Sequence, residues 1–247
     1  MQRLPTALPH RTELRSLKMR ILFLALCLIA TPAHAGTRAT YLRPDGGSTI
    51  IEVADSGDAR IGQANDVEYG LLVNGRFYMI EAGRDGTFVM SLNDIAEAAG
   101  LVLPREFGRL RKSLRALSAA ESNLESDGTE TVAGRPGYRF RMKHSDIVER
   151  LVVSDDPALR PVGAAMEGIA VASVAAMGAL FGDEMSSEVI QHIRDMFARG
   201  APLKTFDGWT LATVEDAEVP RDRVALPEMP LSADEVTQRL RTKRSGS

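Results

Sequence analysis

Nucleophilic catalysis would need serine, histidine and an acid, and these residue types stand side by side at His144-Ser145-Asp146. A catalytic triad brings such residues together from separate parts of a fold, and three consecutive side chains cannot form one. His192 stands alone farther along, and the chain has no His-Glu-x-x-His, no Gly-x-Ser-x-Gly and no cysteine pair. The sequence therefore predicts no catalytic residues and no cofactor, and a hydrolase is the least favoured function.

Four aspartates near turns carry the oxygen ligands that calcium prefers: Asp55, Asp58, Asp66 and Asp85. They lack the Asp-x-Asp-x-Asp-Gly spacing of a calcium loop. Turn formation accounts for them more simply, because aspartate side chains hydrogen-bond to nearby backbone. We expect no metal site.

The first 35 residues have the order of a secretory signal peptide. Basic residues up to Arg20 precede an apolar run at 21–30, and Ala33-His34-Ala35 supplies the small residues of a cleavage site. We expect cleavage after Ala35 and a periplasmic protein. Either Met1 or Met19 serves as the start.

Cys27 is the chain's one cysteine, and it lies within this apolar run. A lipid-modified cysteine follows a small residue, and Leu26 is not one, so we expect no acyl anchor. The chain carries 33 acidic and 30 basic residues, and cleavage after Ala35 removes one acidic and five basic residues, which leaves 32 acidic and 25 basic residues and a net charge of −7. This acidic balance of the mature chain argues against nucleic acid as a partner.

Residues 161–181 are apolar except at Glu167 and Ser173. A helix that is apolar all round must be buried in protein or lipid. Half of this helix is Ala or Gly and Glu167 carries charge, so we expect a buried plug and no transmembrane segment in the mature chain. Its larger side chains would line a ligand cavity: Met166, Ile169, Val174, Met177, Leu180 and Phe181.

The first half reads as an antiparallel meander of short strands separated by turn residues. Asn74-Gly75 is the strongest hairpin signal, because both residues accept positive φ. Pairing across it places Leu71 opposite Tyr78, and we assign both to the ligand cavity. Leu72 and Phe77 fall on the other face, so both faces are apolar and each needs a cover. We expect further strands at 38–42, 48–53, 59–63, 87–91, 129–133, 137–142, 149–154, 203–206 and 209–217.

Helices are expected at 91–99, 104–120 and 186–199, and a short polar helix is expected at 232–241. The second is strongly basic and could lie on an anionic membrane, although a solvated face is the simpler interpretation. Its cations are Arg105, Arg109, Arg111, Lys112 and Arg115.

The closing part of the chain carries a loose family pattern: Gly200-Ala-Pro-Leu203, then Trp209-Thr-Leu, then Val219-Pro-x-x-x-Val224-Ala-Leu-Pro227. With the Asn-Gly hairpin, it resembles uncharacterised periplasmic proteins of the LolA/LolB-like lipoprotein-carrier superfamily. The arginine-containing signature of true carriers is absent. The resemblance implies an α+β fold in which a curved antiparallel sheet, a half-open barrel, wraps around an apolar helix, with additional amphipathic helices.

These observations predict one domain at 36–230 after the signal peptide, followed by a polar C-terminal helix and tail at 231–247. The favoured function is non-enzymatic binding of a lipid or other hydrophobic ligand between sheet and apolar helix. The alternative is an envelope module that binds a protein partner or senses stress without a ligand.

Overall fold

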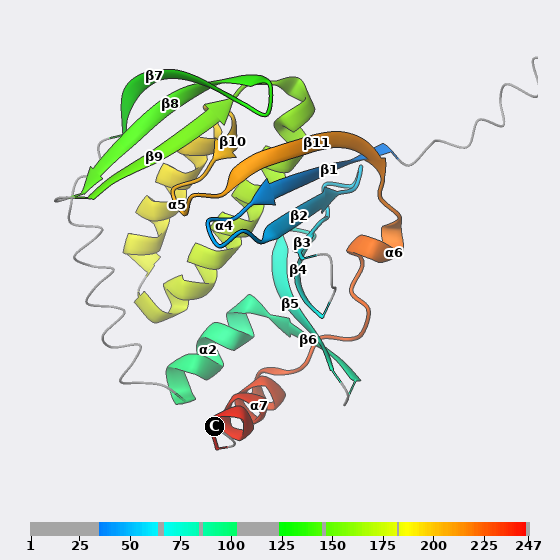
Figure 1. Cartoon of the computed structure of the whole chain (residues 1–247). Coiled ribbons are helices and arrows are strands. Elements are labelled where there is room, and N and C mark those ends of the chain that lie inside the picture. The colour runs from blue at the N-terminus through cyan, green and yellow to red at the C-terminus, as the bar shows by residue number, and fades with distance from the viewer. Residues whose placement is uncertain are drawn as a thin grey trace, which may run out of the picture. The chain divides into compact units, whose positions relative to one another are not determined.

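The computed structural model describes residues 35–63, 67–83, 86–102, 124–144, 147–181 and 183–245 (Figure 1). All of them belong to one compact unit, His34–Ser247. The predicted signal peptide up to residue 34, with Cys27, lies outside the described residues. The same holds for the predicted basic helix at 104–120, with Arg105, Arg109, Arg111, Lys112 and Arg115.

Eleven strands in the described part of the chain form a single antiparallel sheet that is not closed, in the order β6-β5-β4-β3-β2-β1-β11-β10-β9-β8-β7. The strands are β1 Ala35–Leu42, β2 Ser48–Val53, β3 Ala59–Gly62, β4 Glu68–Val73, β5 Arg76–Gly83, β6 Gly86–Ser91, β7 Leu124–Val132, β8 Arg135–His144, β9 Ile147–Ser154, β10 Ala201–Lys204 and β11 Thr210–Glu218. Together with the helices, this sheet confirms the predicted α+β class.

Five α-helices occur within the described residues. A short 3-10 turn, η1 (Pro157–Leu159), directly precedes α4. They are α2 Leu92–Val102, α4 Arg160–Phe181, α5 Asp183–Phe197, α6 Arg221–Val224 and α7 Ala233–Ser245. Figure 1 shows α4 and α5 side by side, which agrees with their mutual contacts.

The Asn74-Gly75 hairpin is confirmed. Asn74 and Gly75 have φ of 50° and 73°, and Leu71 pairs with Tyr78 as predicted. A second hairpin, expected around residues 134–137, turns earlier at Ala133-Gly134, where φ is 51° and 74°. Both central residues of such a two-residue turn have positive φ, which Gly134 accepts freely and Ala133 adopts as a non-glycine residue. Residues 135–137 therefore belong to β8.

One face of the sheet packs on the start of α4. Val162 and Ala165 of α4 join a buried cluster with strand residues such as Ile51, Leu72 and Leu203. Tyr41 belongs to this cluster, and its buried hydroxyl donates a hydrogen bond to the carbonyl oxygen of Pro202 at 2.8 Å. Burial raises the pKa of the Tyr41 hydroxyl, so it stays a donor.

Glycines allow α4 to approach its neighbours closely. A Cβ added to Gly163 would lie 2.9 Å from Cβ of Ala201 in β10. One added to Gly168 would lie 2.7 Å from Leu72 in β4, and one added to Gly178 would lie 2.5 Å from Ser186 in α5. These distances are shorter than real carbon contacts, so the helix fits only because its contacting residues are small.

The membrane prediction for this helix stays a prediction. In the described part of the chain, Pro157–Gly178 is long and apolar enough to cross a membrane, and 28% of its most apolar window is buried. A core helix of a soluble protein has the same composition. The packing of Val162 and Ala165 on the sheet supports that interpretation.

The opposite face of β4, β5 and β6 carries its own apolar cluster of Leu71, Tyr78, Ile80 and Val89. It is covered by residues 219–231, called the covering segment below. Leu226 of this segment packs on the cluster, and α6 within it contacts β3 and β4. The backbone N–H of Leu231 then donates to the carbonyl oxygen of Val89 on β6 at 2.8 Å.

A buried carboxylate anchors the covering segment. Glu52 on β2 has a side chain only 2% exposed and accepts hydrogen bonds from Arg38 Nη2 and Arg223 Nε, both at 2.8 Å. Nη1 of Arg60, on β3, lies 3.8 Å from Oε2 of the same Glu52 carboxylate. The guanidinium of Arg60 also stacks on the Tyr69 ring, 4.0 Å from its centroid.

We expect Gly163→Val to lower the free energy of unfolding by about 1–3 kcal/mol, because the added side chain collides with β10. Ala164→Val is the matched control, since Ala164 is exposed on the same helix and loses only about 0.5 kcal/mol of helix propensity. Urea unfolding of both variants measures the difference. Equal losses would contradict the close contact of α4 with β10.

We expect Glu52→Gln to cost about 3 kcal/mol, because it removes the negative charge lying between three arginines. Glu215→Gln is the control. Glu215 is 60% exposed and lies 3.8 Å from Arg38, so its loss should cost no more than about 0.5 kcal/mol. Chemical denaturation at neutral pH decides, and a Glu52→Gln variant as stable as the control would refute the anchoring role.

Candidate functional site

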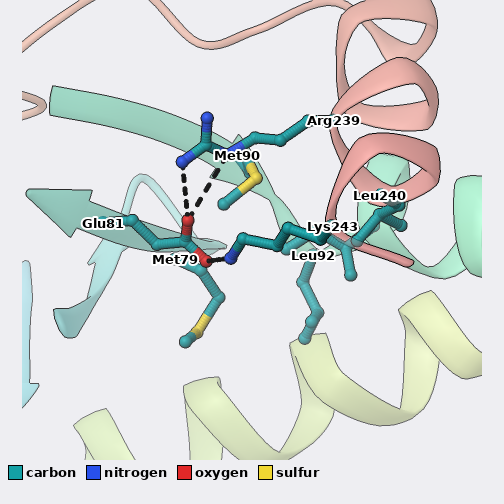
Figure 2. Close-up of a pocket in the computed structure, with 8 residues that line it drawn as sticks. Met79, Glu81, Met90, Leu92, Arg239, Leu240 and Lys243 are labelled. Carbon is teal, nitrogen blue, oxygen red and sulfur yellow. Dashed lines mark hydrogen bonds and ion pairs between the residues drawn. The ribbon is translucent and has the colours of Figure 1, made fainter. Parts of the chain in front are cut away.

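A cavity of about 290 Å³ lies between the β5–β6 end of the sheet and helices α2 and α7. Its walls are mainly apolar, and Figure 2 shows its charged side chains meeting at one side. Strands β5 and β6 and helices α2 and α7 each contribute residues. The lining residues are Met79, Glu81, Met90, Leu92, Ile95, Arg239, Leu240 and Lys243.

Alternation along the sheet places the strand residues in this cavity. Met79 and Glu81 are two apart on β5 and so share a face, and Met90 pairs with Met79 from β6. Leu71 and Ile80 belong to the opposite face. The pocket is therefore on the same side of the sheet as α4.

Both helices that close the pocket begin with side-chain caps. At the start of α2, Ser91 Oγ accepts from the backbone N–H of Asp94 at 3.1 Å. At the start of α7, Glu235 accepts from the backbone N–H of Ser232 at 2.8 Å, and Ser232 Oγ accepts in return from Glu235. The second arrangement is a capping box, which fixes where α7 begins.

Apolar packing holds α2 and α7 together against the sheet. Met90, Ala98 and Val236 are buried in one cluster, with Leu231 and Ile95 packed against it. Since α7 joins this cluster, it belongs to the same compact unit as the sheet. The C-terminal helix thus forms one wall of the pocket.

An ion-pair network lies at the pocket's edge. Oε2 of Glu81 accepts from Arg239 Nη2 at 3.0 Å, and Oε1 accepts from Lys243 Nζ at 2.7 Å (Figure 2). The Arg239 guanidinium also lies 3.5 Å from the centroid of the Phe88 ring, which is a cation–π contact. The network connects α7 to the C-terminal half of β5.

The network also sets the protonation of Glu81. Burial by itself raises the pKa of the Glu81 carboxyl, but hydrogen bonds from Lys243 and Arg239, and their charges, outweigh burial. The pKa therefore lies below the ordinary value of 4.5. At neutral pH the pocket edge carries one negative charge between two positive charges.

Of the residues predicted to line a cavity, those whose side chains the structure describes do not line this one. Met166 and Ile169 pack against the core on the α4 side, and Val174 and Met177 are half-buried on α4. Leu71 and Tyr78 lie on the other face of the sheet, under Leu226, so the structure does not bring them to α4. The side chains of Leu180 and Phe181 lie outside the described residues.

The structure describes the side chain of one of the two histidines of the predicted mature chain, His192. His192 is exposed on α5, and the backbone of His144 ends β8. Residues 145 and 146 lie outside the described part. Within that part, no group of three or more His, Cys, Asp or Glu side chains could hold a metal ion.

Sequence reasoning missed Glu81, Arg239 and Lys243. Phe77, Met79 and Glu81 alternate along β5 and therefore share a face of the sheet. A charged residue on this otherwise apolar face was one signal that the sequence offered. Its partners stand 158 and 162 residues farther along the chain, and no local pattern connects residues so distant. The capping box at Ser232 and Glu235 was the other readable signal.

We expect Glu81→Gln to lower stability at neutral pH by on the order of 1 kcal/mol, since charge-assisted hydrogen bonds to α7 are lost. Because the folded-state pKa of Glu81 is depressed, its contribution is complete above 4.5 and disappears as pH falls through the folded value. Unfolding of wild type and variant between pH 7 and 3 should therefore show a difference that shrinks below about pH 4.5. A difference that is constant or grows in acid would contradict this.

No protein-family model matches the chain, and the searches of curated proteins and of solved structures returned no match either. The resemblance to LolA/LolB-like carriers therefore stays a prediction.

Proposed function

We propose that this chain is an exported, non-enzymatic binding module that holds a hydrophobic ligand on the concave side of its sheet. The observation that carries the proposal is the apolar cavity of about 290 Å³ between β5, β6, α2 and α7. Ligand pockets in proteins are mainly apolar, with a few polar groups that orient the guest, and range from about 300 to 1,000 Å³. This cavity has that character and lies near the lower limit of size.

The lining suits a flexible guest. Met79 and Met90 are paired neighbours on β5 and β6, and both contribute to the cavity from the same face of the sheet. Methionine has an unbranched, polarizable side chain that adapts to irregular apolar shapes. Leu92 and Leu240 complete apolar walls on the two helices. The cavity thus favours an alkyl chain over a rigid polar ligand.

The fold supports a concave binding side. Helix α4 contacts β1, β2, β4, β5 and β10, which lie far apart in the sheet order. Strand β11 also contacts β7, although three strands separate them. We propose that the sheet curves around α4 as a half-open barrel, in which the pocket is the part left unfilled by that helix.

The test is binding of the apolar dye N-phenyl-1-naphthylamine, followed by fluorescence. We expect saturable binding to wild type and about threefold weaker binding by Met79→Phe and by Leu92→Phe, since each ring takes up part of the cavity and replaces a flexible side chain with a rigid one. Met229→Phe is the control, because Met229 is 86% exposed and outside the pocket lining. Thermal melts confirm that each variant is folded.

Two results would overturn the proposal. One is the absence of saturable dye binding to folded wild type. The other is equal weakening by the control and the pocket variants, which would place the dye elsewhere.

A further inference from the structure

Helix α7 packs on its neighbours around one buried side chain. Among the α7 side chains that the structure describes, Val236 alone is buried, and it is fully shielded from solvent. It packs with Met90 of β6 and Ala98 of α2, and Leu240 packs against the same cluster. Among the described elements, α2 is the main neighbour of α7. The apolar part of this interface is small, so separating α7 from α2 and β6 costs less free energy than unfolding the sheet.

Helix α7 depends on that interface for its helical structure. It has 13 residues, Ala233–Ser245, and an isolated helix of this length is marginal in water. The capping box of Ser232 and Glu235 fixes where the helix begins, but it satisfies backbone groups at one end only. When α7 leaves α2 it therefore loses much of its helix as well, and its backbone N–H groups become open to exchange with water.

Polar contacts across the interface give the docked helix one defined position. Arg239 of α7 bonds to Glu81 of β5 and stacks on the Phe88 ring of β6. The side chains of Arg239 and Glu81 are only 26% and 22% exposed, so this ion pair is partly shielded from solvent. Because the two contacts come from different strands, they orient α7 about its own axis. The docked state is thus a specific arrangement of side chains.

The pocket lies within the same interface. Arg239, Leu240 and Lys243 line it from α7, and β5, β6 and α2 supply the other lining residues (Figure 2). A guest in the cavity therefore contacts both sides of the interface only while α7 is docked. A ligand that binds one of two states multiplies the weight of that state by one plus the ratio of free ligand to Kd. Filling the pocket and docking α7 are linked for this reason.

We propose that α7 is an occupancy-dependent element: it undocks transiently and unfolds locally in the empty protein, and a guest in the pocket holds it docked. This inference rests on the proposed function and adds regulation to it. Undocking uncovers Met90 and Ala98, the apolar residues that pack with Val236. The filled protein keeps them covered, so the surface around α7 reports whether the pocket holds a guest.

Hydrogen exchange of single backbone amides, followed by NMR on the folded protein, measures the undocking. In wild type without a guest, we expect the amides of residues 237–241 to exchange at least about tenfold faster than those of β4, which open only when the sheet unfolds. Low concentrations of urea should accelerate α7 exchange less steeply than β4 exchange, because undocking exposes less surface than unfolding. Equal rates with equal urea slopes would show that α7 opens only with the whole domain, and would overturn the proposal.

The same measurement with N-phenyl-1-naphthylamine at three times its Kd tests the link to the pocket. The α7 amides should exchange about fourfold more slowly, because the bound guest multiplies the weight of the docked state by one plus three. Amides of α5 that exchange faster than those of β4 are the control. None of the described α5 side chains lines the pocket, so these amides should keep their rates within about 1.5-fold.

A pair of variants on α7 tests the interface itself. Val236→Ala removes two methyl groups from the buried contact, so the α7 amides should exchange about tenfold faster. Gln238→Ala is the matched control, because Gln238 is exposed on the same helix and lies outside the pocket lining. It should change these rates by less than about twofold. Equal effects of the two substitutions would contradict docking through Val236.

The outcomes distinguish the two proposals. Dye that binds without slowing α7 exchange would overturn the occupancy-dependent helix and leave the hydrophobic pocket standing. The absence of saturable dye binding to folded wild type would overturn both. Saturable binding together with selectively slower α7 exchange would support both.

Discussion

The apolar character of both faces of β4, β5 and β6 is the constraint on which this fold depends. Leu71 and Tyr78 face one way, and Leu72 and Met79 face the other. A sheet of this kind needs a cover on each side, because apolar surface left in water costs roughly 25 cal/mol per Å². Helix α4 and its neighbours supply one cover, and the covering segment supplies the other. The chain must therefore pass from one side of the sheet to the other, and it does so at the edge of β6, where Leu231 bonds to Val89.

Two glutamates mark the start and end of that passage. Glu52 holds Arg223 on the side of the covering segment, and Glu81 holds Arg239 and Lys243 on the pocket side. The two carboxylates differ in burial, since the Glu52 side chain is 2% exposed and the Glu81 side chain is 22% exposed. Glu52 is enclosed by arginines from β1, β3 and α6, and its role is structural. The Glu81 network is partly open and borders a cavity, so its charges remain within reach of a ligand.

Much of the sheet could be predicted because its signals are local. Asn74-Gly75 fixed a register, and the apolar run at 161–181 marked α4 to within one residue of its start. β7 was predicted to begin at 129 and begins at Leu124, because Asp127 and Gly128 disguise a bulged, polar edge strand. The pocket escaped prediction for a different reason. Its walls come from residues more than 150 positions apart, and only the folded chain shows which face of β5 they meet.

The covering segment and α7 have a consequence for the order in which the molecule folds. They follow all eleven strands in the chain, and they meet partners 158 to 171 residues earlier. During synthesis or export, the strands therefore emerge before the elements that bury them. Contacts across such distances form late and slowly, because loop closure must precede them. Until then β4 to β6 present apolar surface and an open β6 edge, the features that invite aggregation and chaperone binding.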